Sequence, residues 1–235
     1  MPLLPKFIRD LRYRLFYGLL LQRGHELRTL GAPASICKWT ICPRGLDSAS
    51  IVYSGGVGKD ISFEQELVER YGCQVVLLDP SPVGIKTMAL PENQIPQFRF
   101  FPLALTAGTG SLRMGGPADG SDSWHASVEG QQEVPSTNLA ALMKQNGHSY
   151  IDLLKLDIEG CEYEVIDDVL ENRIPVRQLC ADFDYGHVPG VRRSQAIRAI
   201  LRLKQHGYRL ICNDAANHTF LNTRFPGGLE ATRPA

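Results

Sequence analysis

A glycine cluster followed at a fixed distance by an acidic residue is the first feature of the chain that could do chemistry. The cluster, Gly55-Gly56-Val57-Gly58, follows a short apolar run with β-branched residues, and a helical pattern begins after it. Glycines let the backbone turn sharply and let a ligand approach the main chain. The next apolar run ends on Asp79, 23 residues beyond Gly56. An acid about 20 residues past a glycine turn binds ribose in mononucleotide half-folds, so the spacing predicts a nucleoside-cofactor site.

A second set of acidic side chains follows two later apolar runs. Asp157 and Glu159 come at the end of the run at residues 150–156, and Asp182 follows the run at residues 178–181. Because ligands of α/β proteins bind outside the carboxyl ends of the parallel strands, we expect Asp157 to face the same site as the glycine cluster. Glu159 has an alternative role as an acid that stabilises a helix N-terminus.

A proton acceptor for catalysis is expected just beyond the second of these runs. Asp182 or His187 is the candidate general base, because both side chains can accept a proton and imidazole titrates near neutral pH. His187 could equally be a loop residue without a role. Asp157, Asp182 and His187 could together bind a divalent metal, but their spacing does not require one and we predict no metal site. Asp152 and Lys155 are expected to lie outside the pocket.

Alternating strand-like and helix-like segments must position these side chains. The alternation predicts a mostly parallel sheet covered by helices on both faces. We expect helices near residues 60–71, 137–146, 162–170 and 194–206, with another starting near residue 83. Strands are expected near residues 37–41, 50–54, 74–79, 98–105, 110–114, 150–156, 178–183, 208–212 and 218–222.

Residues 115–135 differ in kind from the rest of the chain. They are rich in Gly, Ser, Asp and Gln, with little apolar content. Such a stretch predicts a surface loop without structure of its own, or an active-site lid. Trp124 and His125, in so polar a setting, favour the lid.

Composition limits the classes of protein that the chain could be. Its 235 residues suffice for one domain with a full core, and its 43% hydrophobic and 21% charged residues are typical of globular proteins. The 25 basic and 25 acidic residues balance, which argues against a nucleic-acid-binding protein. Six dispersed cysteines without a C-x-x-C pair predict reduced thiols in a cytoplasmic protein.

Residues 1–30 form a basic segment with an amphipathic helical pattern. They hold six Lys or Arg residues against two acids. The apolar run at residues 15–21 is too short to cross a bilayer, so we expect no stable membrane insertion. Such a helix could lie on an anionic membrane surface. We favour packing on its own domain or on a second subunit of a homodimer.

The chain resembles the FkbM-type, class I S-adenosylmethionine-dependent methyltransferases over roughly residues 50–222. The most specific stretch, Ile151–Glu162, is similar to that family's strand-4 signature. Residues 52–58 resemble its cofactor turn, residues 78–82 its strand-2 end, and residues 102–105 the segment behind the adenine pocket. The resemblance implies an α/β, Rossmann-like fold with a mostly parallel seven-stranded sheet, an antiparallel last strand and helices on both faces.

The resemblance also implies a division of the chain and a reaction. Residues 1–49 are expected to form an extension, residues 50–222 the catalytic domain and residues 223–235 a tail. The implied reaction is the methylation of a hydroxyl group on a small molecule or sugar. The implied cofactor, S-adenosylmethionine, would be held by Ser54, Gly55, Gly56, Gly58, Asp60, Glu64, Asp79 and Leu105.

One departure from the family and two rival functions stay open at this point. The family commonly has an acid where this chain has Ser54, and Asp60 and Glu64 could take over its contact with the methionine ammonium group. An NAD-dependent oxidoreductase is disfavoured, because Ile61 stands where the third glycine of G-x-G-x-x-G belongs. A non-catalytic module that kept the cofactor fold is the other rival, since fold does not imply function.

Overall fold

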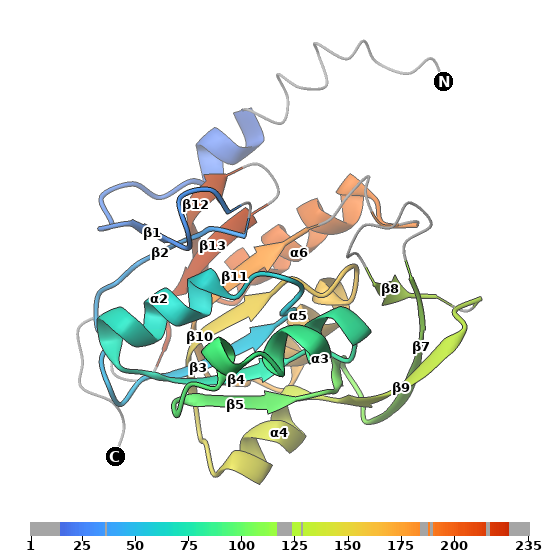
Figure 1. The fold of residues 1–235 in the computed structure, drawn as a ribbon. Helices are drawn as coiled ribbons and strands as arrows, with labels where there is room; N and C mark the ends of the chain where they lie inside the picture. The colour runs from blue at the N-terminus through green and yellow to red at the C-terminus, as the bar shows by residue number, and fades with distance from the viewer. Residues whose placement is uncertain are drawn as a thin grey trace.

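A seven-stranded sheet forms the centre of the protein (Figure 1). The computed structural model describes residues 15–35, 37–116, 124–127, 129–183, 188, 190–214 and 217–225. The order of the strands across the sheet is β12-β13-β11-β10-β3-β4-β5. Their bounds are β3 Ile51–Gly55, β4 Gln74–Leu78, β5 Phe98–Phe101, β10 Ile151–Leu156, β11 Val176–Asp182, β12 Tyr208–Asp214 and β13 Asn217–Asn222.

The pairing of these strands confirms the predicted fold class. Strands β3, β4, β5, β10 and β11 pair in parallel, and β13, the last strand in the chain, runs antiparallel to both of its neighbours. All six residues of β10 are buried, because a parallel strand in mid-sheet is covered on both faces. Its carboxyl end therefore lies between the ends of β3 and β11, where the predicted site residues Asp157 and Asp182 follow.

The side chains of alternate strand residues point into two separate hydrophobic cores, one on each face of the sheet. Tyr53 and Leu154 point into the larger core, which also takes in apolar residues of three helices: α4 (Leu139–Asn146), α5 (Glu162–Glu171) and α6 (Arg193–Gln205). Val52 and Leu153 point into the second core, with α2 (Ser62–Tyr71) and residues before β3. This period of two is what a strand buried on both faces requires.

The helix boundaries follow local capping chemistry. Helix α2 ends at Gly72, whose φ of 69° lies in the left-handed region that glycine adopts readily. The side chain of Ser81 accepts the N–H of Gly84 at the start of α3 (Pro82–Met88), and Asn138 caps α4 in the same way. A short 3₁₀ turn, η1 (Pro91–Asn93), follows α3.

The residues before β3 pack on the domain rather than apart from it. Strand β1 (Arg28–Leu30), which the sequence did not predict, pairs antiparallel with β2 (Trp39–Ile41). Leu30, Trp39 and Ile41 are at most 1% exposed and belong to the core beneath α2. Residues 15–20 are helical, and the described end of this helix packs on its own domain, as favoured. The division at residues 49 and 222 stays a prediction.

A separate sheet of four described strands corrects two predictions. Its order is β6-β9-β7-β8, with bounds β6 Ala104–Leu105, β7 Gly110–Gly115, β8 His125–Ala126 and β9 Gln132–Thr137. The predicted strand at residues 98–105 is split, because Pro102 separates β5 of the main sheet from β6. The predicted loop at residues 115–135 contains β8 and the start of β9. Only Met114 and Val134 of the β7–β9 pair bury an apolar side chain in this sheet's core, so the alternation was too faint to recognise.

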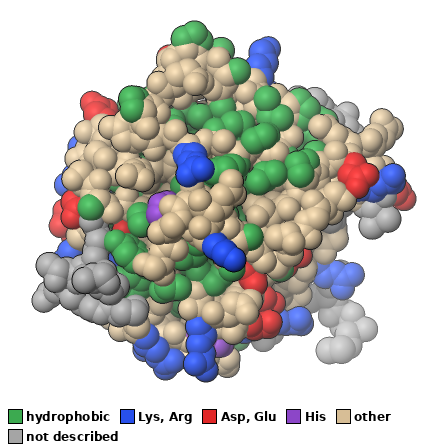
Figure 2. Space-filling model, turned by 90° about the horizontal axis from the view of Figure 1, so that it is seen from below, with side chains coloured by type: hydrophobic (Ala, Val, Ile, Leu, Met, Phe, Trp, Pro, Cys, Tyr) green, Lys and Arg blue, Asp and Glu red, His purple; other side chains and the backbone are tan. Residues whose placement is uncertain are grey.

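The surface is mixed in charge where Figure 2 shows it. On this face basic side chains lie singly or in small groups among acidic and hydrophobic ones, and they do not form one continuous basic surface. The absence of nucleic-acid binding stays a prediction. Among the described helices, none is long and apolar enough to cross a membrane.

A buried ion pair at the amino end of β10 gives the first testable prediction. Asp152 is 2% exposed, accepts the N–H of Ile51 at 2.9 Å and lies 3.8 Å from the guanidinium of Arg177. Asp152→Asn removes the carboxylate charge that lies 3.8 Å from that guanidinium, so we expect the free energy of unfolding to fall by about 3 kcal/mol in urea denaturation. Unchanged stability would contradict the role of this pair.

Candidate active site

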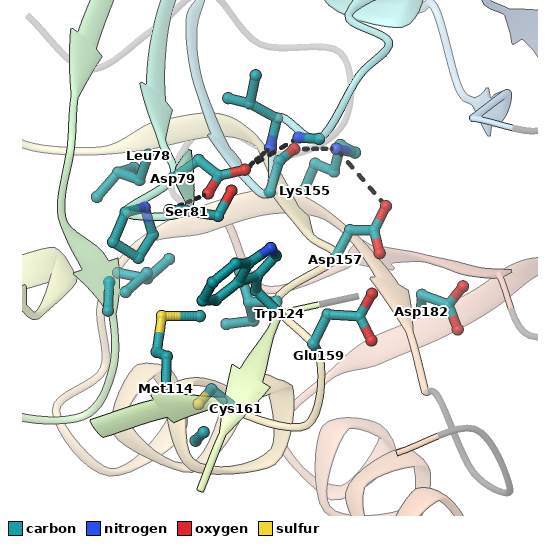
Figure 3. Close-up of a pocket in the computed structure, with 18 of the residues that line it drawn as sticks. Leu78, Asp79, Ser81, Met114, Trp124, Lys155, Asp157, Glu159, Cys161 and Asp182 are labelled. Atoms are coloured by element: carbon teal, nitrogen blue, oxygen red, sulfur yellow. Dashed lines mark hydrogen bonds and ion pairs between the residues drawn. The ribbon is translucent and has the colours of Figure 1, made fainter. Parts of the chain in front are cut away.

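A cavity of about 590 Å³ opens at the carboxyl ends of β3, β4, β10 and β11. Its volume lies within the range of pockets that bind cofactors and drug-sized molecules. Figure 3 shows the carboxylates of Asp157, Glu159 and Asp182 on one side, Asp79 and Ser81 on the other, and Trp124 between them. The lining includes these predicted site residues: Gly56, Gly58, Asp60, Asp79, Leu105, Asp157, Glu159 and Asp182.

The glycine turn after β3 is pressed against the end of β10. Gly56 has a φ of +88°, and a Cβ atom there would overlap the main-chain carbonyl oxygen of Asp157. The N–H of Asp157 donates to the carbonyl of Gly55 at 3.1 Å. Gly58, with a φ of +54°, has open space where a Cβ would lie. The turn therefore needs glycine at position 56 for close packing and at position 58 for backbone conformation.

Asp79 fastens this turn to the end of β4. One carboxylate oxygen accepts the N–H groups of Val57 and Gly58, both at 2.9 Å, and the other accepts the N–H of Ser81 at 2.8 Å. The side chain is 7% exposed and still lines the cavity. The predicted ribose-binding acid thus also organises the main chain around the site.

Lys155 stands at the centre of a buried charge network, and the expectation that it lies outside the pocket was wrong. Its ammonium donates to the carbonyl oxygen of Gly56 at 2.7 Å. It lies 3.3 Å from the carboxylate of Glu64 and 3.8 Å from that of Asp157. Burial by itself lowers the pKa of Lys155, but these two carboxylates outweigh it and the pKa is raised. The side chain lines the cavity, whereas Asp152 lies outside it, as expected.

Three of the predicted cofactor-binding residues lie behind the cavity wall. Ser54 and Glu64 are at most 1% exposed, and the hydroxyl of Ser54 donates to the carboxylate of Glu64 at 2.5 Å. Gly55 lies beside them at the end of β3. Asp60, by contrast, lines the cavity. Burial raises the pKa of Asp60, but hydrogen bonds from Ser35 and Ser62 outweigh this effect and lower the pKa overall.

The acids at the ends of β10 and β11 lie in differing surroundings. Burial raises the pKa of Asp157, and the nearby Lys155 only partly opposes this effect. Glu159 has a φ of +54°, which is uncommon for a residue with a side chain and typical of functional turns. Asp182 ends β11 opposite Asn217 of β13, and both line the cavity. His187 lies outside the described residues.

Glu162 is a site residue that the sequence analysis missed. Its side chain is fully buried at the start of α5 and accepts the N–H groups of Ile158 and Gly160 at 2.7 and 2.9 Å. It therefore builds the turn that carries Glu159. Burial raises the pKa of Glu162 to about 8, against the effect of these hydrogen bonds. An acid in the first turn of a helix just after a glycine was the signal available in the sequence.

An apolar wall from the small sheet closes another side of the cavity. Leu112, Met114, Trp124 and Ala126 line it. Only Trp124 was singled out in the sequence, as part of a lid. His125 lies next to it in β8 and is not among the lining residues.

Two of the chain's six cysteines line the cavity. All six cysteines are free. Cys37 and Cys161 line the cavity, and burial raises the pKa of both thiols, that of Cys161 to about 12. No group of three or more His, Cys, Asp or Glu side chains among the described residues could hold a metal ion.

A Rossmann-like sheet with an acidic, glycine-edged cavity at its carboxyl edge defines a nucleoside-cofactor enzyme of the α/β class. The model of the methyltransferase FkbM domain matches residues 54–210. The chain belongs to the FkbM methyltransferase family. It is therefore an S-adenosylmethionine-dependent methyltransferase, and S-adenosylmethionine rather than NAD is its cofactor.

Solved structures resemble the chain only distantly. The METTL16 methyltransferase domain is 11% identical with a TM-score of 0.45, over 93% of this chain and 70% of that one. A Methanococcus jannaschii fibrillarin pre-rRNA processing protein is 10% identical with a TM-score of 0.42, over 77% of this chain and 67% of that one. A human methyltransferase 10 domain-containing protein is 8% identical with a TM-score of 0.37, over 94% and 83% of the two chains. No curated protein sequence matches the chain.

A comparison of alanine variants at Gly56 and Gly58 tests whether the close packing of the glycine turn is needed for ligand binding. Gly56→Ala forces a methyl group into the Asp157 carbonyl, so we expect the loss of measurable S-adenosylhomocysteine binding in calorimetry, with a lower melting temperature. Gly58→Ala adds a methyl group in open space and strains only the backbone, at a cost of about 1 kcal/mol. Equal losses in both variants would show that the tight contact at Gly56 is not what matters.

The buried carboxyl of Glu162 predicts a pH dependence of stability. Its pKa is about 8 in the folded protein and close to 4.5 in the unfolded chain, so between these values the unfolded state binds fewer protons. The contribution of Glu162 to stability is then fully present below pH 4.5 and is lost as the pH rises through 8, with a slope of up to about 1.4 kcal/mol per pH unit. Glu162→Gln should flatten this part of the curve in urea denaturation between pH 5 and 8. An identical slope in the variant would remove the assignment.

Proposed function

We propose that the protein transfers a methyl group to a hydroxyl group of a small molecule or sugar. The observation that carries this proposal is the convergence of three carboxylates, Asp157, Glu159 and Asp182, on one side of the cavity, beyond the glycine turn. A hydroxyl group must lose a proton as it is methylated, and a carboxylate within reach of the acceptor can take it. A cavity lined only by apolar and neutral groups would offer no such proton acceptor.

The cavity suits the charge of S-adenosylmethionine. Five carboxylates, those of Asp60, Asp79, Asp157, Glu159 and Asp182, line it against two lysines, Lys59 and Lys155. The cofactor carries a sulfonium and an ammonium group, so an acidic lining favours it electrostatically. The flat face of its adenine ring could pack on the apolar side chains of Leu105 and Ile158, which also line the cavity. The residues present therefore fit this cofactor.

The predicted binding residues divide into contacts and supports. We assign Gly56, Gly58 and Asp79 to the methionine and ribose side of the cofactor, and Leu105 to the adenine side. Asp60 takes the place of the missing strand-end acid near the ammonium group. The remaining predicted residues, Ser54, Gly55 and Glu64, support the turn from behind.

The protein's part in the reaction is to align, exclude water and accept a proton. The sulfonium of bound S-adenosylmethionine supplies the activated methyl group. Asp157 and Glu159 border the reacting centre and orient the acceptor, and Asp182 or His187 takes the acceptor's proton. Leu112, Met114 and Trp124 form an apolar wall that limits access of water. A homodimer and a cytoplasmic location remain predictions.

The cofactor and the base are tested separately. S-adenosylhomocysteine should bind in calorimetry with micromolar affinity, and NAD, the control ligand, should not bind. Asp182→Asn keeps the size of the side chain but removes its charge, so we expect at least a hundredfold loss of turnover with unchanged S-adenosylhomocysteine affinity. Turnover is measured as S-adenosylhomocysteine release with panels of matched hydroxylated and amine acceptors. Methylation of the amines alone would refute the hydroxyl assignment.

A further inference from the structure

Lys155 is the side chain through which the glycine turn, helix α2 and the end of β10 meet. Its ammonium contacts a main-chain carbonyl of the turn, the Glu64 carboxylate on α2 and the Asp157 carboxylate after β10. The side chain is only 5% exposed, and the ammonium lies 5.7 Å from the centre of the Trp39 ring. Water therefore screens these interactions little.

The two carboxylates stand in different relations to the cavity. Glu64 is 2% exposed at its side chain and is not among the residues that line the cavity, whereas Asp157 is 31% exposed at its side chain and lines it. The Lys155 ammonium therefore links the buried Glu64 to Asp157, an acid that lines the cavity. It also holds the Gly56 carbonyl, which belongs to the same turn.

We propose that Lys155 is a positioning residue, held by Glu64, that favours the charged form of the Asp157 side chain and holds it against the cofactor turn. The proposal rests on the proposed function for the place of Asp157 beside the reacting centre. A structural lysine would stabilise the fold without governing the charge of Asp157. The two cases differ in how the titration of Asp157 responds to its neighbours.

The charges around Asp157 set the direction of each response. Lys155 favours its ionised form, while Glu64 of α2 and Asp79 after β4 oppose it. Glu162 of α5 and Cys37 before β2 are also electrostatically coupled to it. Removing Lys155 should therefore raise the pKa of Asp157, and removing Glu64 should lower it. Shifts of the Asp157 pKa in opposite directions indicate electrostatic coupling to these two residues. General destabilisation would not give opposite shifts.

The experiment is a ¹³C NMR titration of the side-chain carboxyls, with the Asp157 resonance assigned by Asp157→Asn. We expect the titration midpoint of Asp157 to rise by about one pH unit or more in Lys155→Met and to fall in Glu64→Ala. S-adenosylhomocysteine affinity should fall about tenfold in Lys155→Met, because the turn loses its charged hydrogen bond. This titration needs no acceptor and no turnover, so it stands even where the hydroxyl assignment fails.

The most decisive variant moves the carboxylate partner of Lys155 from position 64 to position 54. The Ser54 hydroxyl lies 2.5 Å from the Glu64 carboxylate, so Ser54→Asp combined with Glu64→Ala returns a carboxylate to Lys155 from the strand instead of the helix. We expect this double variant to restore the wild-type midpoint that Glu64→Ala loses. If Lys155→Met does not fold, the single and double variants at positions 54 and 64 still decide.

Asp152→Asn is the matched control, since it breaks another buried ion pair on the same strand outside the cavity. It should lower stability and leave both the Asp157 midpoint and the ligand affinity unchanged. A midpoint that stays fixed in Lys155→Met and in Glu64→Ala, or that moves in the same direction in both, overturns the proposal.

Discussion

The contact between the glycine turn and the end of β10 is the constraint on which the site depends. The two main chains approach so closely at Gly56 and Asp157 that no side chain fits between them. This approach brings the end of the first parallel strand against the end of its neighbour, and it fixes where a ligand can meet the backbone. It is possible because β3 and β10 are paired in register up to Gly55 and Leu156.

Buried carboxyl side chains hold the loops on either side of this contact. Asp79 accepts N–H groups of the glycine turn and Glu162 accepts those of the β10–α5 turn. Neither has a cation as its hydrogen-bond partner in these contacts, so both replace water at main-chain groups that the turns leave unsatisfied. Asp157 and Glu159, which line the cavity, lie next to the turns that Asp79 and Glu162 hold in place. The site is thus supported by carboxyl groups that do not need to touch a substrate.

The sequence predicted the parallel sheet because its strands are continuous apolar runs. Such runs are typical of strands in a sheet that is covered on both faces. It also placed Asp79, Asp157 and Asp182 at one edge, since the carboxyl ends of parallel strands must meet there. It did not predict the buried ion pair between Lys155 and Glu64. A charge inside an apolar run gives no sign of its partner when that partner lies 91 residues away in the chain. It failed too for β8 and β9, whose short polar strands are stabilised by pairing with β7 rather than by their own pattern.

Both tryptophans of the chain line the cavity, Trp39 from the segment before β3 and Trp124 from the edge of the small sheet. No other indole contributes to the emission of the protein. The intrinsic fluorescence is therefore a built-in optical probe of this one cavity, with one reporter beside the Lys155 ammonium and another on the apolar wall. If either tryptophan is replaced by phenylalanine, the remaining one is the sole indole. A change in its emission then shows whether a bound ligand lies near that part of the cavity.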